Sequence, residues 1–171
     1  MILLAELNFE NTPEDEASTF GVRNTARAVV FDNDKNIALM NVSKEHFHKL
    51  PGGGIDNDEK PKEALKRECK EEAGVEIDAI VELGFIKEIK KESKAVQNSY
   101  CYIAHVIGKK GLPQFTEFET AKGFKILWVS IDDALDLVKN DTYEKIAGKY
   151  IAERELAILK AAKEIYYPSH I

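Results

Sequence analysis

The sequence predicts an α+β fold, in which helices cover a sheet that contains a long hairpin. Residues 77–90 and 95–107 have the composition of long strands, and only the polar residues 91–94 separate them. Apolar residues recur at helical spacing elsewhere, and this mixture indicates α+β layers rather than a doubly wound parallel sheet. No repeat or low-complexity linker divides the 171 residues, so we expect a single domain over residues 1–171.

The first third of the chain is predicted to form strands that are joined by polar turns. Residues 10–18 are acidic and contain Asn11 and Pro13, which is typical of a loop. The segment 32–36 is a turn between two runs rich in β-branched and apolar residues. The strands expected in this part are residues 2–9, 26–31, 37–42 and 46–50, the last of which runs into a glycine loop at Gly52–Gly54.

Residues 61–73 are predicted to form a helix. An apolar stripe runs along one side of this segment at Leu65, Cys69 and Ala73. Pro61 suits a first helical turn, and Gly74 suits the position just past a helix end. Lys60 is a weak N-cap, since Ser or Thr would accept a backbone hydrogen bond there.

After the long hairpin we expect one more strand and two helices. The strand is residues 124–130, and the helices are residues 131–138 and 143–166. The last helix has apolar residues at Ile146, Tyr150, Ile151, Ile158 and Leu159.

Composition and charge limit the partners and the compartment. The formal net charge of −6 argues against a broad basic surface for duplex nucleic acid, but it permits a small basic pocket for one nucleotide. Cys69 and Cys101 are too few for a disulfide framework, so we expect reduced, semi-buried thiols. The N-terminal apolar run is too short for a signal peptide, and no segment approaches the ~20 apolar residues of a membrane span. We therefore expect a cytoplasmic protein without a membrane partner.

Three carboxylates on the helix over residues 61–73 form the most informative feature of the chain. Glu68, Glu71 and Glu72 stand at i, i+3 and i+4 and therefore share one helical face, where they repel one another. Oxygen ligands of this kind suit Mg²⁺ or Mn²⁺. The alternative is an exposed charged face neutralised by Lys66 and Lys70, but those lysines point to a different side of the helix.

The residues around these carboxylates resemble the Nudix box. Gly53, Glu59, Arg67-Glu68, Glu71-Glu72 and Gly74 are in register with the motif, with apolar Cys69 and Val75 at its variable positions. If each of the seven fixed identities occurs about once in ten residues, a chance match is on the order of one in ten million per start position. The chain is therefore similar to MutT-like pyrophosphohydrolases of the Nudix hydrolase superfamily.

This resemblance implies a fold, a cofactor and roles for particular residues. The fold is a Nudix α/β/α sandwich with a mixed sheet, closed on one side by the long C-terminal helix. Glu68, Glu71 and Glu72 would bind Mg²⁺ or Mn²⁺, with Glu59 in a supporting position and Arg67 bracing the loop through a carboxylate. Two departures from the family pattern are Lys60, where Thr is common, and Asp56-Asn57-Asp58, where Glu-Pro-Gly is usual.

The glycine run and a later acidic segment complete the predicted site. Without a Cβ, the Gly52–Gly54 backbone can approach a phosphate or a metal ion closely, and Gly53 is the candidate metal ligand in this run. Composition alone favours a solvated loop for residues 116–119. The resemblance implies an additional catalytic Glu from this region, and the spacing to Gly123-Phe124 favours Glu119 over Glu117. The catalytic set is thus Glu71, Glu72 and Glu119.

Three basic residues are candidates for phosphate contacts. Arg23 and Arg27 flank the start of a strand and Lys49 precedes the glycine loop, although lone basic residues often serve only surface solvation. Aromatic residues that could stack on a base are Phe20, Phe47 and Tyr100, with core packing as the alternative. His46 and His48 are not expected to be ligands.

Together these features predict hydrolysis of a phosphoanhydride in a nucleoside diphosphate linked to another group, such as a nucleoside triphosphate or a nucleotide sugar. Divalent ions would neutralise the phosphates, and a carboxylate would take a proton from the attacking water. The alternatives are a catalytically weak nucleotide-binding sensor, an isomerase of the same superfamily and an RNA 5′-end pyrophosphohydrolase. The partner expected is a small nucleotide, and the sequence leaves open whether the protein is a monomer or a homodimer.

Overall fold

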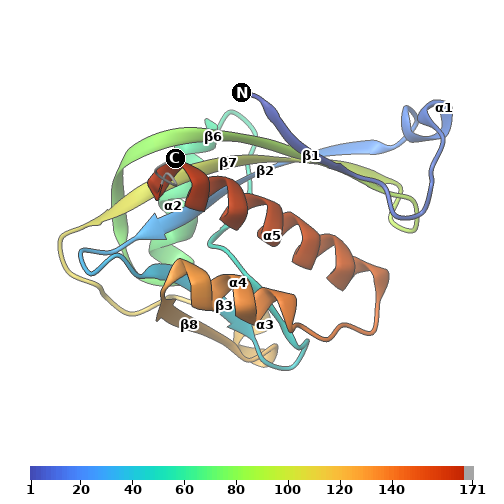
Figure 1. The fold of residues 1–171 in the computed structure, drawn as a ribbon. Helices are drawn as coiled ribbons and strands as arrows, with labels where there is room; N and C mark the ends of the chain where they lie inside the picture. The colour runs from blue at the N-terminus through green and yellow to red at the C-terminus, as the bar shows by residue number, and fades with distance from the viewer. Residues whose placement is uncertain (168–171) are drawn as a thin grey trace.

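The computed structural model describes residues 1–167, which form one large sheet flanked by helices (Figure 1). The strands are β1 (Leu3–Leu7), β2 (Gly21–Phe31), β3 (Ile37–Val42), β4 (Phe47–Lys49), β5 (Gly52–Gly54), β6 (Glu76–Lys90), β7 (Ala95–Ile107) and β8 (Phe124–Val129). The helices are α1 (Glu14–Ala17), α2 (Pro61–Ala73), α3 (Glu117–Ala121), α4 (Ile131–Lys139) and α5 (Ile146–Tyr166).

The sheet is mixed, as expected. Its strand order is β1-β6-β7-β2-β3-β4, with β5 paired to β2 and β8 paired to β3. The β6–β7 hairpin is antiparallel, which confirms the prediction from the polar segment 91–94. The β1–β6 and β2–β7 pairs are parallel. Strand β2 is therefore central and is in a position to support the short glycine strand β5.

Both faces of the sheet are buried where β2 crosses it. Val29 and Phe31 belong to the core cluster that includes residues of α4 and α5, whereas Ala26, Ala28 and Val30 belong to the cluster that includes residues of α2. This alternation explains why the strand reads as an unbroken apolar run in the sequence. Helices α4 and α5 lie on one side of the sheet and α2 on the other, which confirms the predicted α+β layers (Figure 1).

Helix α2 begins and ends at the predicted residues. Ala64, Leu65, Cys69 and Ala73 are buried along its inner side. Lys60 provides no side-chain cap, but its backbone N–H donates to Glu63 Oε2 at 3.0 Å. The helix ends at Gly74, which adopts φ 66° and so closes the last turn in the left-handed region. These ends fix where the carboxylates of α2 lie relative to the sheet.

Five local expectations were wrong. The predicted loop 10–18 contains α1, and residues 117–121 form α3 instead of a loop. Strand β2 starts five residues before residue 26, because its exposed first half is stabilised by pairing with β7 and carries no apolar pattern. Helix α5 starts at Ile146, not at residue 143. The glycine run is strand β5.

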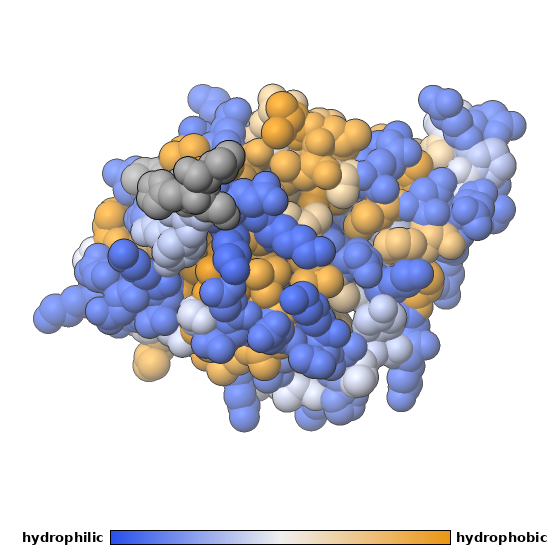
Figure 2. Space-filling view, viewed as in Figure 1, coloured by the Kyte–Doolittle hydropathy of each residue, from blue (hydrophilic) through white to orange (hydrophobic). Residues whose placement is uncertain are grey.

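The outer surface around α5 is mostly hydrophilic, as Figure 2 shows. Apolar side chains gather beside the N-terminal strand in the same view, where Met1, Ile2 and Leu3 are exposed. Within residues 1–167, none of the helices has the length and apolar character needed to cross a membrane.

Candidate active site

Arg67 joins α2 to the glycine strand. Its Nε and NH2 groups donate to Glu59 Oε1 and Oε2, each at 3.0 Å, and NH2 also donates to the Gly54 carbonyl at 3.1 Å. The hydrogen bond from Arg67 lowers the pKa of Glu59. A planar guanidinium suits this task because its fork matches a carboxylate. The contacts have the geometry that the expected bracing role requires.

Glu68 lies directly against the backbone of β5. Its Oε1 accepts a hydrogen bond from Arg67 NH1 at 2.8 Å. A Cβ placed on Gly53 would lie only 2.3 Å from the same oxygen, so the carboxylate occupies the space that any other residue at position 53 would need. Burial raises the pKa of Glu68, and the nearby charges of Glu72 and Glu71 raise it further, against the opposing effect of Arg67.

Glu72 is almost completely buried, and both of its carboxylate oxygens accept hydrogen bonds. Its exposed fraction is 3 %. Its Oε1 accepts from Lys49 Nζ at 2.6 Å, and its Oε2 accepts from the backbone N–H of Gly52 at 2.8 Å. The same Lys49 Nζ lies 5.1 Å from the centre of the Phe124 ring. Lys49 therefore lies between Glu72 on α2 and the ring of Phe124 on β8.

Glu71 is turned outward. Its side chain is 48 % exposed and lies 3.5 Å from Arg67 NH1. Among residues 1–167, the side chains of His, Cys, Asp and Glu form no group of three or more that is arranged to hold a metal ion. The physical reason is that Lys49 and Gly52 draw Glu72 to one side, whereas Arg67 draws Glu68 and Glu71 to the other.

The residues nevertheless suit a hard divalent cation. The donors are carboxylate and backbone oxygens, which Mg²⁺ and Mn²⁺ prefer. The carboxylate of Glu68 is partly buried beside two other carboxylates, and it occupies the space that a side chain at Gly53 would need. A cation would relieve the repulsion that raises the Glu68 pKa.

The backbone conformation and the close approach of β2 require a glycine at position 52. Its φ is +139°, and a Cβ there would lie 2.1 Å from the carbonyl oxygen of Ala26 on the paired strand. Gly52 pairs with Arg27, so this close approach belongs to the β2–β5 ladder. The glycine that fits the sheet is thus Gly52, and the glycine that makes room for a carboxylate is Gly53.

The three basic candidates lie in different environments. Arg23 is exposed, and its NH2 group lies 3.9 Å from the position of a Cβ on Gly54, so its guanidinium lies beside the glycine strand. Lys49 is paired with Glu72. Arg27 is only 7 % exposed and donates to the carbonyls of Leu50 and Gly52. Its burial behind β5 contradicts the predicted phosphate contact.

Glu119 lies in α3, where it takes part in a capping box. Its Oε2 accepts from the backbone N–H of Thr116 at 2.9 Å, and its own N–H donates to Thr116 Oγ1 at 3.2 Å. The pattern Thr-x-x-Glu is a sequence signature of a helix start, so it could have revealed this helix. Within the described chain, no hydrogen bond or ion pair links Glu119 to the carboxylates of α2.

A cavity of about 490 Å³ opens beside the β3–β4 turn, α3 and the start of α5. Aromatic side chains from separate parts of the chain line it, namely Phe47, Phe118, Phe124 and Tyr143, together with Lys44, Lys122 and Lys145. Of these, the sequence had singled out only Phe47. Phe20 instead packs with Ala17 and Ile89, and Tyr100 packs at the edge of the α2 core.

The two histidines near this cavity have separate surroundings. His46 lies in the β3–β4 turn with φ 57° and lines the cavity. His48 Nδ1 lies 2.7 Å from Asp141 Oδ1, and its backbone N–H donates to the same carboxylate. Strand β4 is thereby attached to the segment before α5.

The fold resembles those of several solved structures. The MutT protein of Methanosarcina mazei Go1 has a TM-score of 0.52 at 17 % identity, over 80 % of this chain and 94 % of that one. The E. coli ORF135 protein has a TM-score of 0.57 at 19 % identity, over 90 % and 98 %. The MutT NUDIX hydrolase of Burkholderia pseudomallei has a TM-score of 0.54 at 19 % identity, over 77 % and 96 %. These similarities concern the fold.

Membership of a family follows from the sequence match. No curated protein matches the chain. The NUDIX domain model matches residues 21–153, which run from β2 into α5 and include the whole α2 site. The chain therefore belongs to the NUDIX domain family and is a Nudix-type hydrolase of pyrophosphate bonds.

Proposed function

We propose that the protein hydrolyses a phosphoanhydride in a nucleoside diphosphate linked to another group, with Mg²⁺ or Mn²⁺ as cofactor and with water attacking phosphorus. The observation that carries this proposal is the contact between Glu68 and Gly53. A partly buried carboxylate with a raised pKa lies against a backbone segment that has no side chain in the way. This arrangement is costly by itself and becomes favourable when a divalent cation binds.

Glu68, Glu71, Glu72 and the backbone of Gly53 would hold the cation. When bound, the cation would neutralise phosphate charge and orient the attacking water. Arg67 keeps β5 and Glu59 in fixed positions beside the site. Lys49, released from Glu72, and the exposed Arg23 would contact the phosphates.

The aromatic cavity is the proposed location of the nucleoside. Phe124 lines this cavity and is also the ring over which Lys49 Nζ lies, so two side chains, Phe124 and Lys49, link the cavity to Glu72. Base stacking on aromatic rings and contacts of lysines with phosphates suit a nucleotide. The volume of about 490 Å³ falls within the range of ~300–1,000 Å³ that is common for small-molecule sites.

The proposal is tested with Glu72→Gln. A glutamine can still accept the hydrogen bond from Gly52, so the fold should be kept while a charged ligand is lost. We expect kcat at saturating Mg²⁺ to fall by at least ~10²-fold, with a melting temperature near that of the parent. Glu63→Gln is the matched control, because it changes a carboxylate at the other end of α2 and should leave kcat unchanged. Turnover of Glu72→Gln near the parental value would contradict the metal assignment.

The substrate class is tested with a panel of nucleoside triphosphates, nucleotide sugars and 5′-triphosphorylated RNA in the presence of Mg²⁺. Release of phosphate or pyrophosphate from small nucleotides supports the proposal. Turnover confined to RNA would instead identify a 5′-end pyrophosphohydrolase, and binding without turnover would identify a nucleotide sensor. Both cysteines are free and buried, which agrees with the proposed cytoplasmic location.

A further inference from the structure

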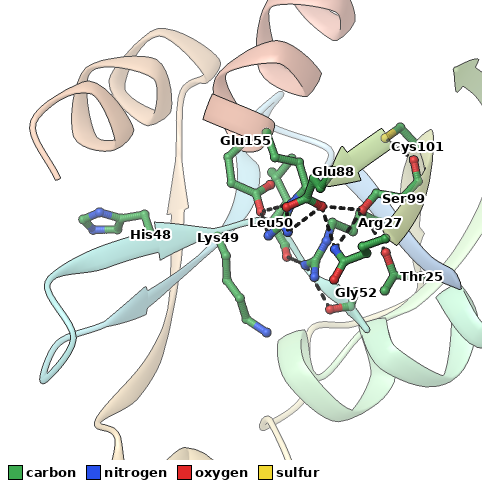
Figure 3. Close-up of polar contacts among 12 residues, drawn as sticks. Thr25, Arg27, His48, Lys49, Leu50, Gly52, Glu88, Ser99, Cys101 and Glu155 are labelled. Carbon is green, nitrogen blue, oxygen red and sulfur yellow. Dashed lines mark hydrogen bonds and ion pairs between the residues drawn. The ribbon is translucent and has the colours of Figure 1, made fainter. Parts of the chain in front are cut away.

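A cluster of charged side chains is buried between the sheet and α5 (Figure 3). Arg154 and Glu155 come from α5, Glu88 from β6 and Arg27 from β2, with exposed fractions of 3 %, 0 %, 0 % and 7 %. Buried charges destabilise a fold unless they are paired and hydrogen-bonded. A cluster of this size in a small domain therefore calls for a role beyond packing.

Three members of the cluster pair with one another, although Glu155 Oε2 has no hydrogen-bond partner within the described residues. Arg154 NH1 lies 3.3 Å from both carboxylate oxygens of Glu88, and its NH2 donates to Glu155 Oε1 at 2.6 Å. Glu88 also accepts from the side chains of Gln97 and Lys90. The contacts of Arg154 with Glu88 attach α5 to β6.

Arg27 has a different kind of partner. Its NH1 donates to two backbone carbonyls, those of Leu50 at 3.4 Å and Gly52 at 3.2 Å. Within the described residues no carboxylate forms an ion pair with it, and its buried Nε has no hydrogen-bond partner. Burial and the positive charge of Arg154 lower the pKa of Arg27, and the negative charges of Glu155, Glu72 and Glu88 oppose this only in part.

Gly52 is held from both sides of the sheet. Its carbonyl accepts from Arg27 on the α5 side, and its N–H donates to Glu72 Oε2 on the α2 side. Its backbone conformation leaves no room for a side chain. A shift of this residue would therefore move the donor that orients the Glu72 carboxylate.

We propose that Arg27 is a positioning residue, which holds the Gly52 carbonyl so that the Gly52 N–H orients Glu72. The inference rests on the proposed function in one respect only, namely that Glu72 belongs to the catalytic site. The competing explanation is that Arg27 contributes only to stability, as any member of a buried charged cluster would.

Arg27→Met and Arg154→Met form a matched pair that separates these explanations. Both remove a buried guanidinium from the same cluster, but only Arg27 contacts the glycine strand. Amide hydrogen exchange at Gly52 is measured by NMR in protein without added metal or substrate. The kcat and KM values are measured with Mg²⁺ at a temperature where each variant is folded.

We expect Arg27→Met to speed exchange at Gly52 by ~10-fold or more and to lower kcat by ~10- to 10²-fold with KM little changed. Arg154→Met should lower the melting temperature but leave both quantities within ~3-fold of the parent, and Arg27→Lys should recover part of the lost kcat. Equal effects of the two Met variants on Gly52 exchange, or no effect of Arg27→Met, would overturn the proposal.

Two further outcomes are covered by the same design. If Arg27→Met does not fold, Arg27→Lys replaces it as the test variant. The shorter lysine side chain should still speed exchange at Gly52, and unchanged exchange would overturn the proposal. If the parent protein hydrolyses no phosphoanhydride in any nucleotide of the panel, the proposed function fails, whereas the comparison of Gly52 exchange rates still tests the role of Arg27.

Discussion

At the scale of single residues, two adjacent glycines have different physical tasks. A Cβ on Gly52 would meet backbone atoms of Ala26 and Arg27, which cannot move without breaking the β2–β5 ladder. The three atoms nearest to a Cβ on Gly53 would all belong to the carboxylate of Glu68, the free end of a flexible side chain. The first glycine therefore serves the fold, and the second serves the site.

This difference predicts opposite effects of two alanine substitutions. Gly53→Ala should fold normally but displace the Glu68 carboxylate, which lowers kcat by ~10²-fold. Gly52→Ala should lower the free energy of unfolding by roughly 1–3 kcal/mol or more, because of backbone strain and clash. Urea unfolding and kcat per folded molecule distinguish the two. If Gly53→Ala reduced only stability, β5 would have a purely structural role.

Glu68 should make stability depend on pH. Its pKa is raised above the ordinary 4.5, so the folded protein keeps a proton over a pH range in which the unfolded chain has lost it. Stability is therefore lost as the pH rises through that range, and the whole penalty is present above it. Glu68→Gln should raise the melting temperature in EDTA at pH 7, with a difference that shrinks towards pH 4.

Added Mg²⁺ provides the second half of this test. The ion should raise the melting temperature of the parent by binding the folded protein, and it should raise that of Glu68→Gln less. Equal increases in both proteins would show that the ion binds elsewhere.

At the scale of elements, α3 carries Glu119, the candidate general base, and borders the aromatic cavity. Its five residues depend on a capping box between Thr116 and Glu119, so the proposed base already has a structural task. Its neighbour Phe118 lines the aromatic cavity. Helix α3 is thus in a position to respond to a bound nucleotide.

Glu119→Gln separates the two tasks of this residue. Glutamine also completes a capping box, so α3 should persist while the carboxylate is lost. If Glu119 is the general base, kcat should fall by ~10²- to 10⁴-fold with little change in KM, and the acidic limb of the pH–rate profile should shift or vanish. Glu117→Gln is the matched control on the same helix. A large effect of Glu117→Gln alone would transfer the role to Glu117, and no effect of either would return it to α2.

At the scale of the whole molecule, the site depends on both layers around the sheet. Helix α2 supplies the carboxylates from one side, and α5 buries Ile158, Leu159 and Ala162 against the other. Between them, β2 carries Arg27 towards α5 and pairs with the glycine strand. The single domain expected from the sequence would then unfold as one unit.

Leu159→Ala tests this cooperativity. Leu159 is completely buried, so the substitution should lower the free energy of unfolding by about 2–5 kcal/mol while a single transition remains. Ile165→Ala on the same helix is the control, since Ile165 is 58 % exposed and its loss should cost less than ~0.5 kcal/mol. Urea titration followed by circular dichroism measures both, and two separate transitions would show that α5 unfolds independently of the sheet.

The sequence by itself determined the local features. Helix α2, the β6–β7 hairpin and the Nudix box were predicted at their observed places, because periodicity, turn residues and motif spacing act within a short stretch of chain. The contact between Arg67 and Glu59 belongs to the same local segment and agrees with the role expected for it. The missed helix α3 also had a local signal, in Thr116 and Glu119.

Only the tertiary structure decided what distant segments do to one another. The burial of Arg27 depends on β5 and α5, which follow it by about 25 and 130 residues, so its sequence neighbours suggested a surface phosphate contact. The aromatic cavity likewise depends on distant segments, because the β3–β4 turn, α3 and the start of α5 all line it. Burial and long-range pairing are properties of the packed sheet, and no short segment of sequence encodes them alone.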